Sequence, residues 1–399
     1  QRQMCIRDSF NDEYKKEMAE LMAAGKTEEE ADKASTIMQE TRKMLQDWEA
    51  GDSQVLALWR TMNGWVYEGF DVTYKRIGSD FDRTYYESQT YLLGKDLVEE
   101  GLKAGVFIKK EDGSVWIDLT AEGLDEKLVL RKDGTSVYIT QDIGLAKQKY
   151  DEYKTDESIY VIADEQNYHM KVLKLICEKL QLPFAPGIYH LSYGMVELPS
   201  GKMKSREGTV VDADDIVSEM ESVAREKTEE LGKVSGFEPG ELQQLYHTIG
   251  MGALKFFLLR VNPKKRMIFD PAESIDFHGF TGPFIQFNHA RIRSVLRKNE
   301  IRASASCGDS LLPVEKEIII MLEQYPSIVK QAAVEHDPSV VAVYIYNLAK
   351  RFSSFYNDHS IANAESEEKK QLRLRIAGLC GMVIRKGMAL LGIGVPERM

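Results

Sequence analysis

The spacing of apolar residues along the chain follows a helical period at both ends and a mixed pattern in the middle. Over residues 10–70, Met, Leu and Trp recur at helical spacing, which predicts an amino-terminal group of helices. Between residues 116 and 137, short apolar runs are separated by Asp-Gly and Glu-Gly pairs, a pattern typical of hairpins or short strands. From residue 282 onward the spacing predicts a helical bundle, with loops over 301–313 and 359–369.

The middle of the chain alternates between strand and helix patterns. Strands are predicted over residues 136–140, 158–163 and 188–196, and helices over residues 142–153 and 167–180. This order implies right-handed crossovers, a parallel sheet and an α/β fold class. Further helices are predicted over residues 212–231, 241–261, 314–322, 340–355 and 372–391.

Polar residues follow each predicted strand of this sheet. They are Gln141 and Asp142, then residues 164–166, and then the loop 201–208. Ligands of open parallel sheets bind beyond the carboxyl ends of the strands, so we expect these three groups to project toward one edge. The sequence therefore predicts a binding site at that edge.

Composition narrows the class of protein. A chain of 399 residues with 43% apolar and 29% charged residues is ordinary for a globular protein of two or three domains. The longest apolar stretches fall far short of the roughly 20 residues that span a bilayer, so no membrane segment is expected. The four cysteines are scattered, which argues against a disulfide framework or a zinc site and favours the cytoplasm: Cys5, Cys177, Cys307 and Cys380.

Net charge divides the chain unevenly. The whole chain carries −11, which argues against a general nucleic-acid binder. Residues 276–399, however, hold 16 Lys and Arg against 13 Asp and Glu, a net charge of +3. This part is the better candidate for contact with phosphate, although so small a charge only permits RNA binding.

The loop Gly201-Lys-Met-Lys-Ser-Arg-Glu-Gly208 is the most informative motif. Amides freed by its glycines and the ammonium groups of Lys202 and Lys204 suit a triphosphate from which pyrophosphate departs. Taken alone, such a run is more often a solvated turn. The motifs around it decide between these interpretations.

Several strings in order resemble arginyl-tRNA synthetase, a class I aminoacyl-tRNA synthetase. They are Tyr138-Ile-Thr-Gln-Asp142, Asp164-Glu-Gln166, His190-Leu-Ser-Tyr-Gly-Met-Val196, the loop 201–208, residues 281–292 and Pro396-Glu-Arg-Met399. The resemblance covers the chain from about residue 10. It implies a connective or inserted part of the catalytic domain over residues 1–135, the second half of a Rossmann-like catalytic domain over 136–275, and an α-helical anticodon-binding domain over 276–399.

The resemblance implies that Tyr138, Asp142 and Gln166 line the arginine pocket, and that Glu87 adds a second carboxylate. A guanidinium is planar and carries five donors, so carboxylates and a phenol or amide suit it. Each residue also has a simpler interpretation: Asp142 and Gln166 could cap helices, and Tyr138 could be a core phenol on a strand.

The resemblance also implies an ATP site along the third strand and the loop. Gly194, Met195 and Val196 would run beside the adenine, with His190 near the ribose or phosphates, although a strand histidine bonded to backbone is an equal alternative. Residues of the loop would contact ATP, with Lys202 and Lys204 as catalytic cations: Lys202, Met203, Lys204 and Ser205. No residue is expected to act as a covalent nucleophile or general base. ATP would arrive with Mg²⁺ as substrate, and no metal site of the protein is expected.

The loop departs from the class pattern Lys-Met-Ser-Lys-Ser, because Ser205 stands where a second lysine normally meets pyrophosphate. We expect Lys204 or Arg206 to substitute for that charge.

For tRNA(Arg), the resemblance points to the helical domain and the carboxyl terminus. Candidate contacts are Phe287, Arg291, Arg293 and Met399. The alternatives are a solvated basic face and a core aromatic. A monomer is expected.

The family's His-x-Gly-His motif and amino-terminal tRNA-binding domain do not occur in this sequence. The first hypothesis is an amino-terminally truncated arginine–tRNA ligase, inactive alone, that forms arginyl-adenylate and transfers arginine to tRNA(Arg). The second is a non-catalytic tRNA-binding fragment or remnant. A synthetase of the same class for another amino acid is disfavoured by the two acidic pocket candidates.

Overall fold

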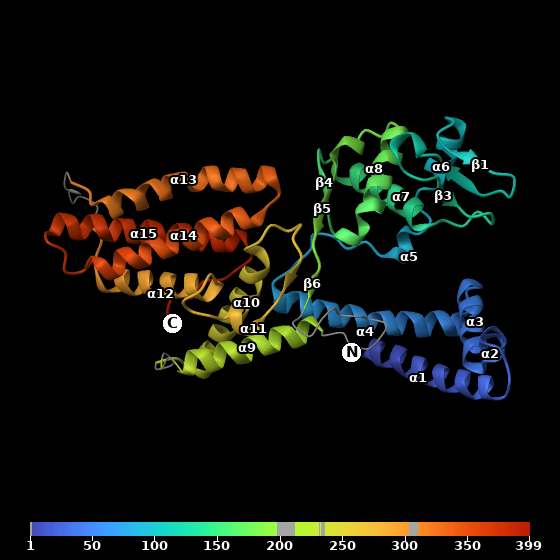
Figure 1. Cartoon of the computed structure of the whole chain (residues 1–399), viewed down its shortest axis with the longest axis horizontal. Helices are drawn as coiled ribbons and strands as arrows, with labels where there is room; N and C mark the ends of the chain where they lie inside the picture. The colour runs from blue at the N-terminus through green and yellow to red at the C-terminus, as the bar shows by residue number, and fades with distance from the viewer. Residues whose placement is uncertain (1, 198–211, 231, 233–235, 303–309) are drawn as a thin grey trace. The chain divides into compact units, whose positions relative to one another are not determined.

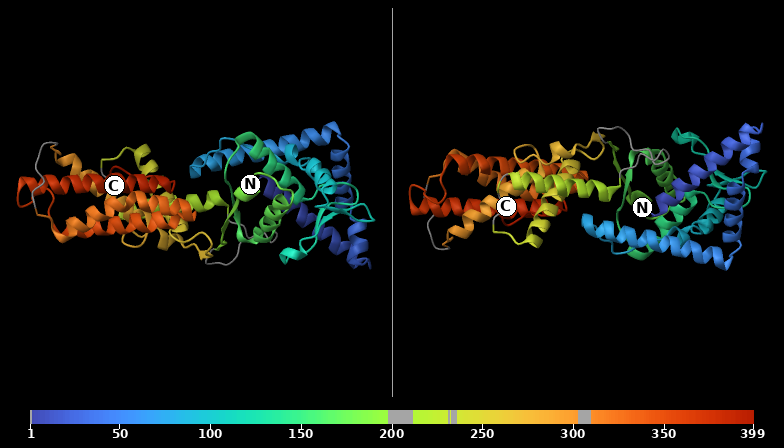
Figure 2. Two further views of the ribbon diagram at one scale, coloured as in Figure 1. Left: turned by 90° about the horizontal axis from the view of Figure 1, so that it is seen from above. Right: turned by 90° about the horizontal axis from the view of Figure 1, so that it is seen from below.

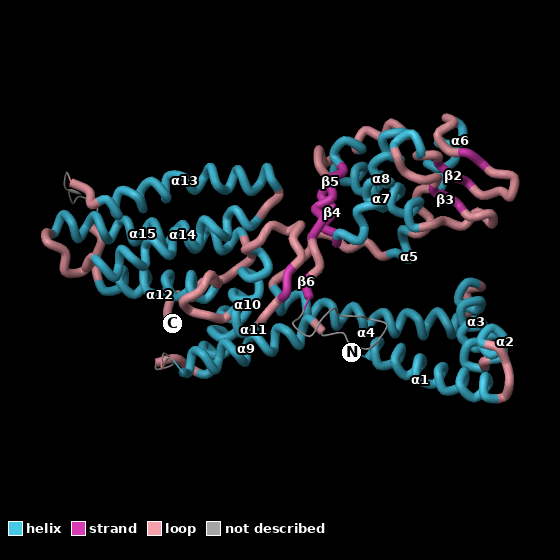
Figure 3. Tube along the Cα trace, in the orientation of Figure 1, coloured by secondary structure: helices cyan, strands magenta, loops and turns pink. Residues whose placement is uncertain are grey.

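The computed structural model describes residues 2–197, 212–230, 232, 236–302 and 310–399. The chain forms two compact units, one made of Gln1–Asp80 with Met203–Ile216 and the other of Phe81–Lys202 with Val217–Met399. Helices predominate in both, and the strands are short (Figure 3).

The first unit is helical, as predicted for residues 10–70. It contains α1 (Arg2–Ala23), α2 (Glu28–Ala34), α3 (Thr36–Glu49) and α4 (Ser53–Ile77). Polar side chains begin these helices: Thr27 forms a capping box for α2, while Ser35 and Asp52 accept hydrogen bonds at the starts of α3 and α4. Gly78 ends α4 in the left-handed conformation (φ 71°).

The second unit begins with an α/β body. After α5 (Glu87–Thr90) and α6 (Lys95–Lys103) comes an antiparallel sheet in the order β1 (Ile108–Lys109), β2 (Val115–Ile117) and β3 (Lys127–Leu130), with the short helix η1 (Thr120–Glu122) between β2 and β3. The short strands predicted near residues 116–137 are confirmed.

A strand and helix repeat follows. It consists of α7 (Tyr138–Tyr153), β4 (Ser158–Ala163), η2 (Asp164–Gln166), α8 (Asn167–Lys179), η3 (Ala185–Gly187) and β5 (Ile188–Tyr193). β4 and β5 are parallel, with Ser158 paired to Ile188 and Ala163 to Tyr193, and α7 and α8 lie beside them (Figure 1). The predicted parallel pairing and the helix before β5 are confirmed.

The strand predicted over residues 136–140 is wrong, because helix α7 begins at Tyr138. Ile139, Ile143 and Ala146 are buried, and their spacing of four and three is that of one helical face. The Thr140 hydroxyl donates to the Val129 carbonyl of β3, which fixes this first turn against the antiparallel sheet. Tertiary contacts of the helix therefore outweigh the β propensity of a short run.

The core of this body lies on one face of β4 and β5. Fully buried residues from β2, α7 and α8 form it, among them Ile117, Ile143, Leu173 and Ile176. On the other face of β4, Ile159 is 46% exposed and Val161 is 64% exposed. A strand buried on one face only is unusual for parallel sheets, which are normally covered on both.

The strand predicted over residues 188–196 is divided in two. β5 ends at Tyr193, and β6 (Val196–Glu197) pairs in parallel with β7 (Met267–Ile268), which the sequence did not predict. The helices α9 (Ala213–Glu230) and α10 (Pro239–Leu259) are confirmed, and the short α11 (Pro271–Ser274) follows β7.

The carboxyl-terminal part is the predicted helical bundle. It contains α12 (Gly282–Lys298), α13 (Pro313–Glu335), α14 (Pro338–Asp358) and α15 (Glu367–Leu390), which lie side by side in both views of Figure 2. Ile345, Phe352 and Ile384 are fully buried at its centre, and Phe256 of α10 packs into the same core. No helix in the described part of the chain is long and apolar enough to cross a membrane.

One buried polar network joins α13 to α15. Glu315, which is fully buried, accepts hydrogen bonds from Arg373 Nε at 3.0 Å, Lys369 Nζ at 2.7 Å and Leu312 N at 2.9 Å. Burial opposes ionisation of Glu315, but these hydrogen bonds outweigh it and hold the pKa of the carboxyl below its ordinary value.

Candidate active site

Tyr138 and Asp142 lie on the first turns of α7. Tyr138 is the first residue of the helix and is 76% exposed, so it is neither a strand residue nor a core phenol. Val137 occupies the N-cap position, so Asp142, one turn further on, is not the cap. Its Oδ2 lies 2.6 Å from His169 Nε2, and the carboxylate is 41% exposed. Asp142 is thus anchored on one side and open to solvent on the other.

Gln166 ends η2, directly after β4, and is exposed. It occupies the N-cap position of α8 but makes no side-chain cap hydrogen bond. Capping therefore does not explain its presence. His169 follows one helical turn later and supplies the partner of Asp142. His169 was not predicted as a site residue, although its spacing from Gln166 places both on one side of the start of α8.

Glu87 is the first residue of α5 and is exposed. The segment before it is attached to α7, because the Tyr85 hydroxyl donates to Glu152 and Arg83 lies 3.4 Å from the same carboxylate. α5 also contacts α7 directly. The structure thus brings together the elements that carry Glu87, Tyr138 and Asp142, and His169 connects them to α8.

A partly buried cation, Lys149, influences the surroundings of Asp142. The Lys149 ammonium lies 4.0 Å from the centre of the Tyr160 ring. Burial lowers the pKa of Lys149, while the charge of Asp142 acts in the opposite direction. Burial likewise raises the pKa of Tyr160 to about 12. The Asp142 carboxylate therefore lies in the field of Lys149 as well as beside His169.

On the predicted ATP side, His190 is bonded to backbone. Its Nε2 lies 3.0 Å from the Ile162 carbonyl of β4 and donates to it. This is the alternative that the sequence left open for a strand histidine. The hydrogen bond orients the ring and joins β5 to the end of β4.

Gly194 stands where β5 ends and the chain passes close to another backbone. Its N–H donates to the Pro263 carbonyl at 2.8 Å, and a Cβ at this position would lie 2.5 Å from the Lys265 carbonyl carbon. Met195 O accepts from Met267 N at 3.2 Å. Two backbone groups of the predicted adenine strand, Gly194 N and Met195 O, are therefore already hydrogen-bonded within the protein. An adenine base would have to bind to other backbone groups of this segment.

The predicted ATP-binding residues of the loop, Lys202, Met203, Lys204 and Ser205, lie outside the described residues.

Replacing Gly194 with Ala tests this close approach. We expect Gly194→Ala to lower the free energy of unfolding by about 1–3 kcal/mol, because Lys265 and Arg266 backbone atoms leave no room for a methyl group. Urea denaturation followed by circular dichroism measures this. Gly240→Ala is the control, since nothing lies within 4 Å of its Cβ position. Equal stability of the two variants would contradict the prediction.

The candidate RNA-binding residues of α12 make contacts within the bundle. The Arg291 guanidinium lies 4.8 Å from the ring centres of both Phe287 and Tyr356 and donates to the Ser353 hydroxyl. Burial lowers the pKa of Arg291. Arg293 Nε donates to Glu397 at 2.5 Å. These side chains are therefore not a freely solvated basic face.

Residues 393–399, here called the carboxyl-terminal tail, are attached to α10 and α12. Gln286 Nε2 donates to Gly394 O at 2.8 Å, and the buried His289 donates through Nδ1 to Pro396 O at 3.0 Å. Burial lowers the pKa of His289, which favours this neutral donor form. Arg398 Nη2 donates a hydrogen bond to Glu241 Oε2 of α10 at 2.6 Å. The residue before Met399 is thus attached to α10.

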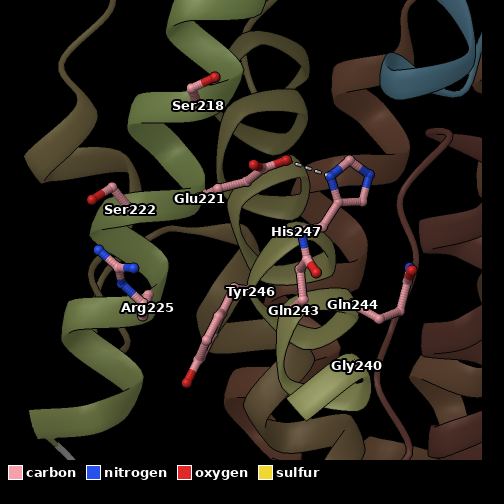
Figure 4. Close-up of a pocket in the computed structure, with 9 residues that line it drawn as sticks. All are labelled: Ser218, Glu221, Ser222, Arg225, Gly240, Gln243, Gln244, Tyr246 and His247. Carbon is pink, nitrogen blue, oxygen red and sulfur yellow. Dashed lines mark hydrogen bonds and ion pairs between the residues drawn. The ribbon is translucent and has the colours of Figure 1, made fainter. Parts of the chain in front are cut away.

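A separate polar groove of about 540 Å³ lies between α9 and α10 (Figure 4). His247 Nδ1 lies 2.8 Å from Glu221 Oε1 within it, and Arg225 lines the same groove. Of the predicted arginine and ATP residues that the structure describes, none lines this groove. Its mixed charges do not select one class of ligand.

Comparison with known proteins first gives the class. Residues 4–270 match the family described as tRNA synthetases class I (R), catalytic domain, and residues 285–399 match the DALR anticodon binding domain. The fold is thus a mixed α/β class I synthetase catalytic domain followed by a helical anticodon-binding domain. The chain belongs to the arginyl-tRNA synthetase family.

Individual relatives agree with this. An arginine–tRNA ligase of Flavobacterium psychrophilum is 53% identical over 392 residues, which are 98% of this chain and 65% of the relative. Among solved structures, the arginyl-tRNA synthetase of Thermus thermophilus has a TM-score of 0.74 at 21% identity, covering 96% of this chain and 73% of that one. The enzyme from Plasmodium falciparum has a TM-score of 0.77 at 17% identity, covering 92% and 64%. The chain therefore spans slightly less than two-thirds of the length of the Flavobacterium psychrophilum ligase.

Proposed function

We propose that this chain is the larger part of an arginine–tRNA ligase. It would activate L-arginine with ATP to arginyl-adenylate and transfer the arginyl group to tRNA(Arg), with release of AMP and pyrophosphate. The observation that carries the proposal is the Asp142 carboxylate, anchored by His169 yet open to solvent, in a chain 53% identical to an arginine–tRNA ligase.

In this proposal Asp142 and Glu87 accept hydrogen bonds from the guanidinium, and Tyr138 and Gln166 set its plane. Charge-assisted, paired hydrogen bonds distinguish arginine from lysine, whose ammonium is a point charge. His169 keeps Asp142 in place and is a positioning residue. Catalysis consists of holding the arginine carboxylate in line with the α-phosphorus and neutralising charge on the departing pyrophosphate.

ATP would lie along residues 190–196, with Mg²⁺ arriving on its phosphates. Among the described residues, no group of three His, Cys, Asp or Glu side chains is placed to hold a metal. Lys202 and Lys204 would supply cations, and Met203 and Ser205 would complete the loop. The boundaries 1–135, 136–275 and 276–399, a monomeric state and a cytoplasmic location belong to the same proposal.

For tRNA, we propose that the helical bundle binds the anticodon arm of tRNA(Arg). The tail is attached to α12 through Arg293 and His289, because both side chains donate hydrogen bonds to it. These two residues would therefore position Met399 for contact with RNA, and their donors that bind the tail would not contact RNA themselves. Arg291 and Phe287 would act as a preformed surface, because each is already packed on its neighbours.

Aminoacylation of tRNA(Arg) with L-arginine tests the proposal. We expect activity from the chain extended at its amino terminus to the length of its relatives, and little from this chain alone. Absence of charging by the extended chain, with folding verified by circular dichroism, would overturn the proposal.

A second candidate, a non-catalytic tRNA-binding fragment, is favoured by the exposed face of β4 at Ile159 and Val161. A start codon and promoter directly before residue 10 would support it. An upstream open reading frame that encodes His-x-Gly-His would support the ligase.

A further inference from the structure

Two consecutive residues of the helical bundle contact the α/β body. His336 ends α13 in a left-handed conformation (φ 50°), and Asp337 begins α14 by accepting a hydrogen bond from Ser339 N at 2.9 Å. We call this pair the α13–α14 corner. Each residue makes a separate contact with the segments that flank the predicted adenine strand.

The first contact is a ring stack at the start of β5. The His336 and Tyr189 rings lie 4.2 Å apart between centres, with 24° between their planes. His336 Nε2 also lies 3.4 Å from Glu157 Oε2, immediately before β4. The His336 side chain is only 19% exposed. The corner therefore holds the beginnings of both parallel strands.

The second contact is a shielded hydrogen bond to the turn that packs against the end of β5. Asp337 is 9% exposed, and its Oδ2 accepts from Asn262 Nδ2 at 2.6 Å. Asn262 opens the turn in which Pro263 O accepts from Gly194 N. The same turn lies so close to Gly194 that a Cβ would not fit. A displacement of Asn262 is therefore transmitted to Gly194.

The two oxygens of Asp337 have different partners. Oδ1 caps α14, which a serine could do equally well, whereas Oδ2 extends away from the bundle to Asn262. A cap alone does not require a carboxylate at this position. The second oxygen serves the contact between the bundle and the α/β body.

We propose that the α13–α14 corner positions residues 189–196 for an adenine nucleotide, so that the helical bundle sets the affinity of this strand for ATP. The assignment of the strand to adenine rests on the proposed function. His336 fixes the start of the strand through Tyr189, and Asp337 fixes its end through Asn262 and Gly194. Both are positioning residues, acting through neighbours on the nucleotide.

Paired variants separate this role from capping. Asp337→Ser keeps the α14 cap but is too short to reach Asn262. Asn262→Asp keeps the acceptor for Lys264 N but sets two carboxylates against each other. The double exchange N262D with D337N restores one donor and one acceptor, and asparagine still caps α14.

Two measurements are made on the chain extended at its amino terminus to the length of its relatives: the Kd for ATP by calorimetry, and amide hydrogen exchange of residues 189–197 without ligand. We expect each single variant to raise the Kd about tenfold and to speed this exchange by about tenfold, because one shielded hydrogen bond is lost. We expect the double exchange to return both values to within about twofold of the parent. His336→Asn, which tolerates the left-handed conformation, should act in the same direction through Tyr189.

Val334→Ala is the control, since this side chain is 71% exposed two residues before His336. Unchanged hydrogen exchange in both single variants, or a double exchange that behaves like the single variants, would overturn the proposal. A parent chain that binds no ATP would contradict the proposed function, whereas the exchange rates would still decide whether the corner holds the strand.

Discussion

Replacing Asp142 with Ala is expected to weaken L-arginine binding about a hundredfold, or roughly 2.7 kcal/mol, in the chain extended to the length of its relatives. The physical reason is the loss of a charged acceptor for the guanidinium at a site already fixed by His169. Isothermal calorimetry with L-arginine measures the change directly. ATP binding should stay within about twofold of the parent, because Asp142 belongs to the amino-acid side of the site.

The control for this variant lies on the same helix. Asp151→Ala removes a carboxylate that pairs with Lys147 at 2.5 Å and Lys154 at 3.0 Å on the exposed surface of α7. Arginine binding by this variant should match the parent. If Asp142→Ala binds arginine as tightly as Asp151→Ala does, Asp142 is not part of the pocket.

The second large effect concerns the stability of the helical bundle. Arg373→Met should lower the free energy of unfolding by about 3–5 kcal/mol, because it leaves the buried Glu315 without one of its cationic partners. Arg373 also donates to the Ser360 carbonyl, which would lose this donor. Urea denaturation at pH 7 measures the loss.

Arg351→Met is the matched control, because Arg351 pairs with Glu317 on the surface of the same bundle, where both side chains are partly exposed. Its cost should not exceed about 1 kcal/mol. Equal losses for the two variants would show that burial of the Glu315 network adds nothing.

The same network predicts how stability depends on pH. Since the pKa of Glu315 is held below its ordinary value of 4.5, its contribution is present above that pH and declines as pH falls through the folded-state pKa. The difference in stability between the parent and Glu315→Gln should therefore shrink below about pH 4.5. A difference that grows on acidification would contradict the sign of the shift.

Local patterns predicted the long elements well. The strand over residues 158–163 has its predicted bounds because an apolar run between two turn-rich segments leaves little choice, and the bundle helices repeat a clear helical period. The strand over residues 136–140 was wrong because five residues do not distinguish a helix start from a strand. The contact of Thr140 with β3 is what favours the helix over the strand in this segment.

Features of the candidate site that depend on distant residues were not predictable. His169 meets Asp142 across 27 positions, and β7 is only two residues long, so its pairing with β6 has no local signal. The attachment of the tail to α12 joins residues about a hundred positions apart. Such contacts form only when the chain has folded and distant segments meet. The residue types alone indicated which ligand groups the site could bind, but not which side chains would be neighbours.

The attached carboxyl-terminal tail has a consequence for shortened forms of the chain. Removal of residues 396–399 would delete the acceptors of His289, Arg293 and Arg297. Since His289 is buried, its ring would lose its hydrogen-bond acceptor inside the bundle. Trimming these four residues, for example before fusing a purification tag, should therefore destabilise the bundle as a substitution in its core would, and should not act as removal of a loose end.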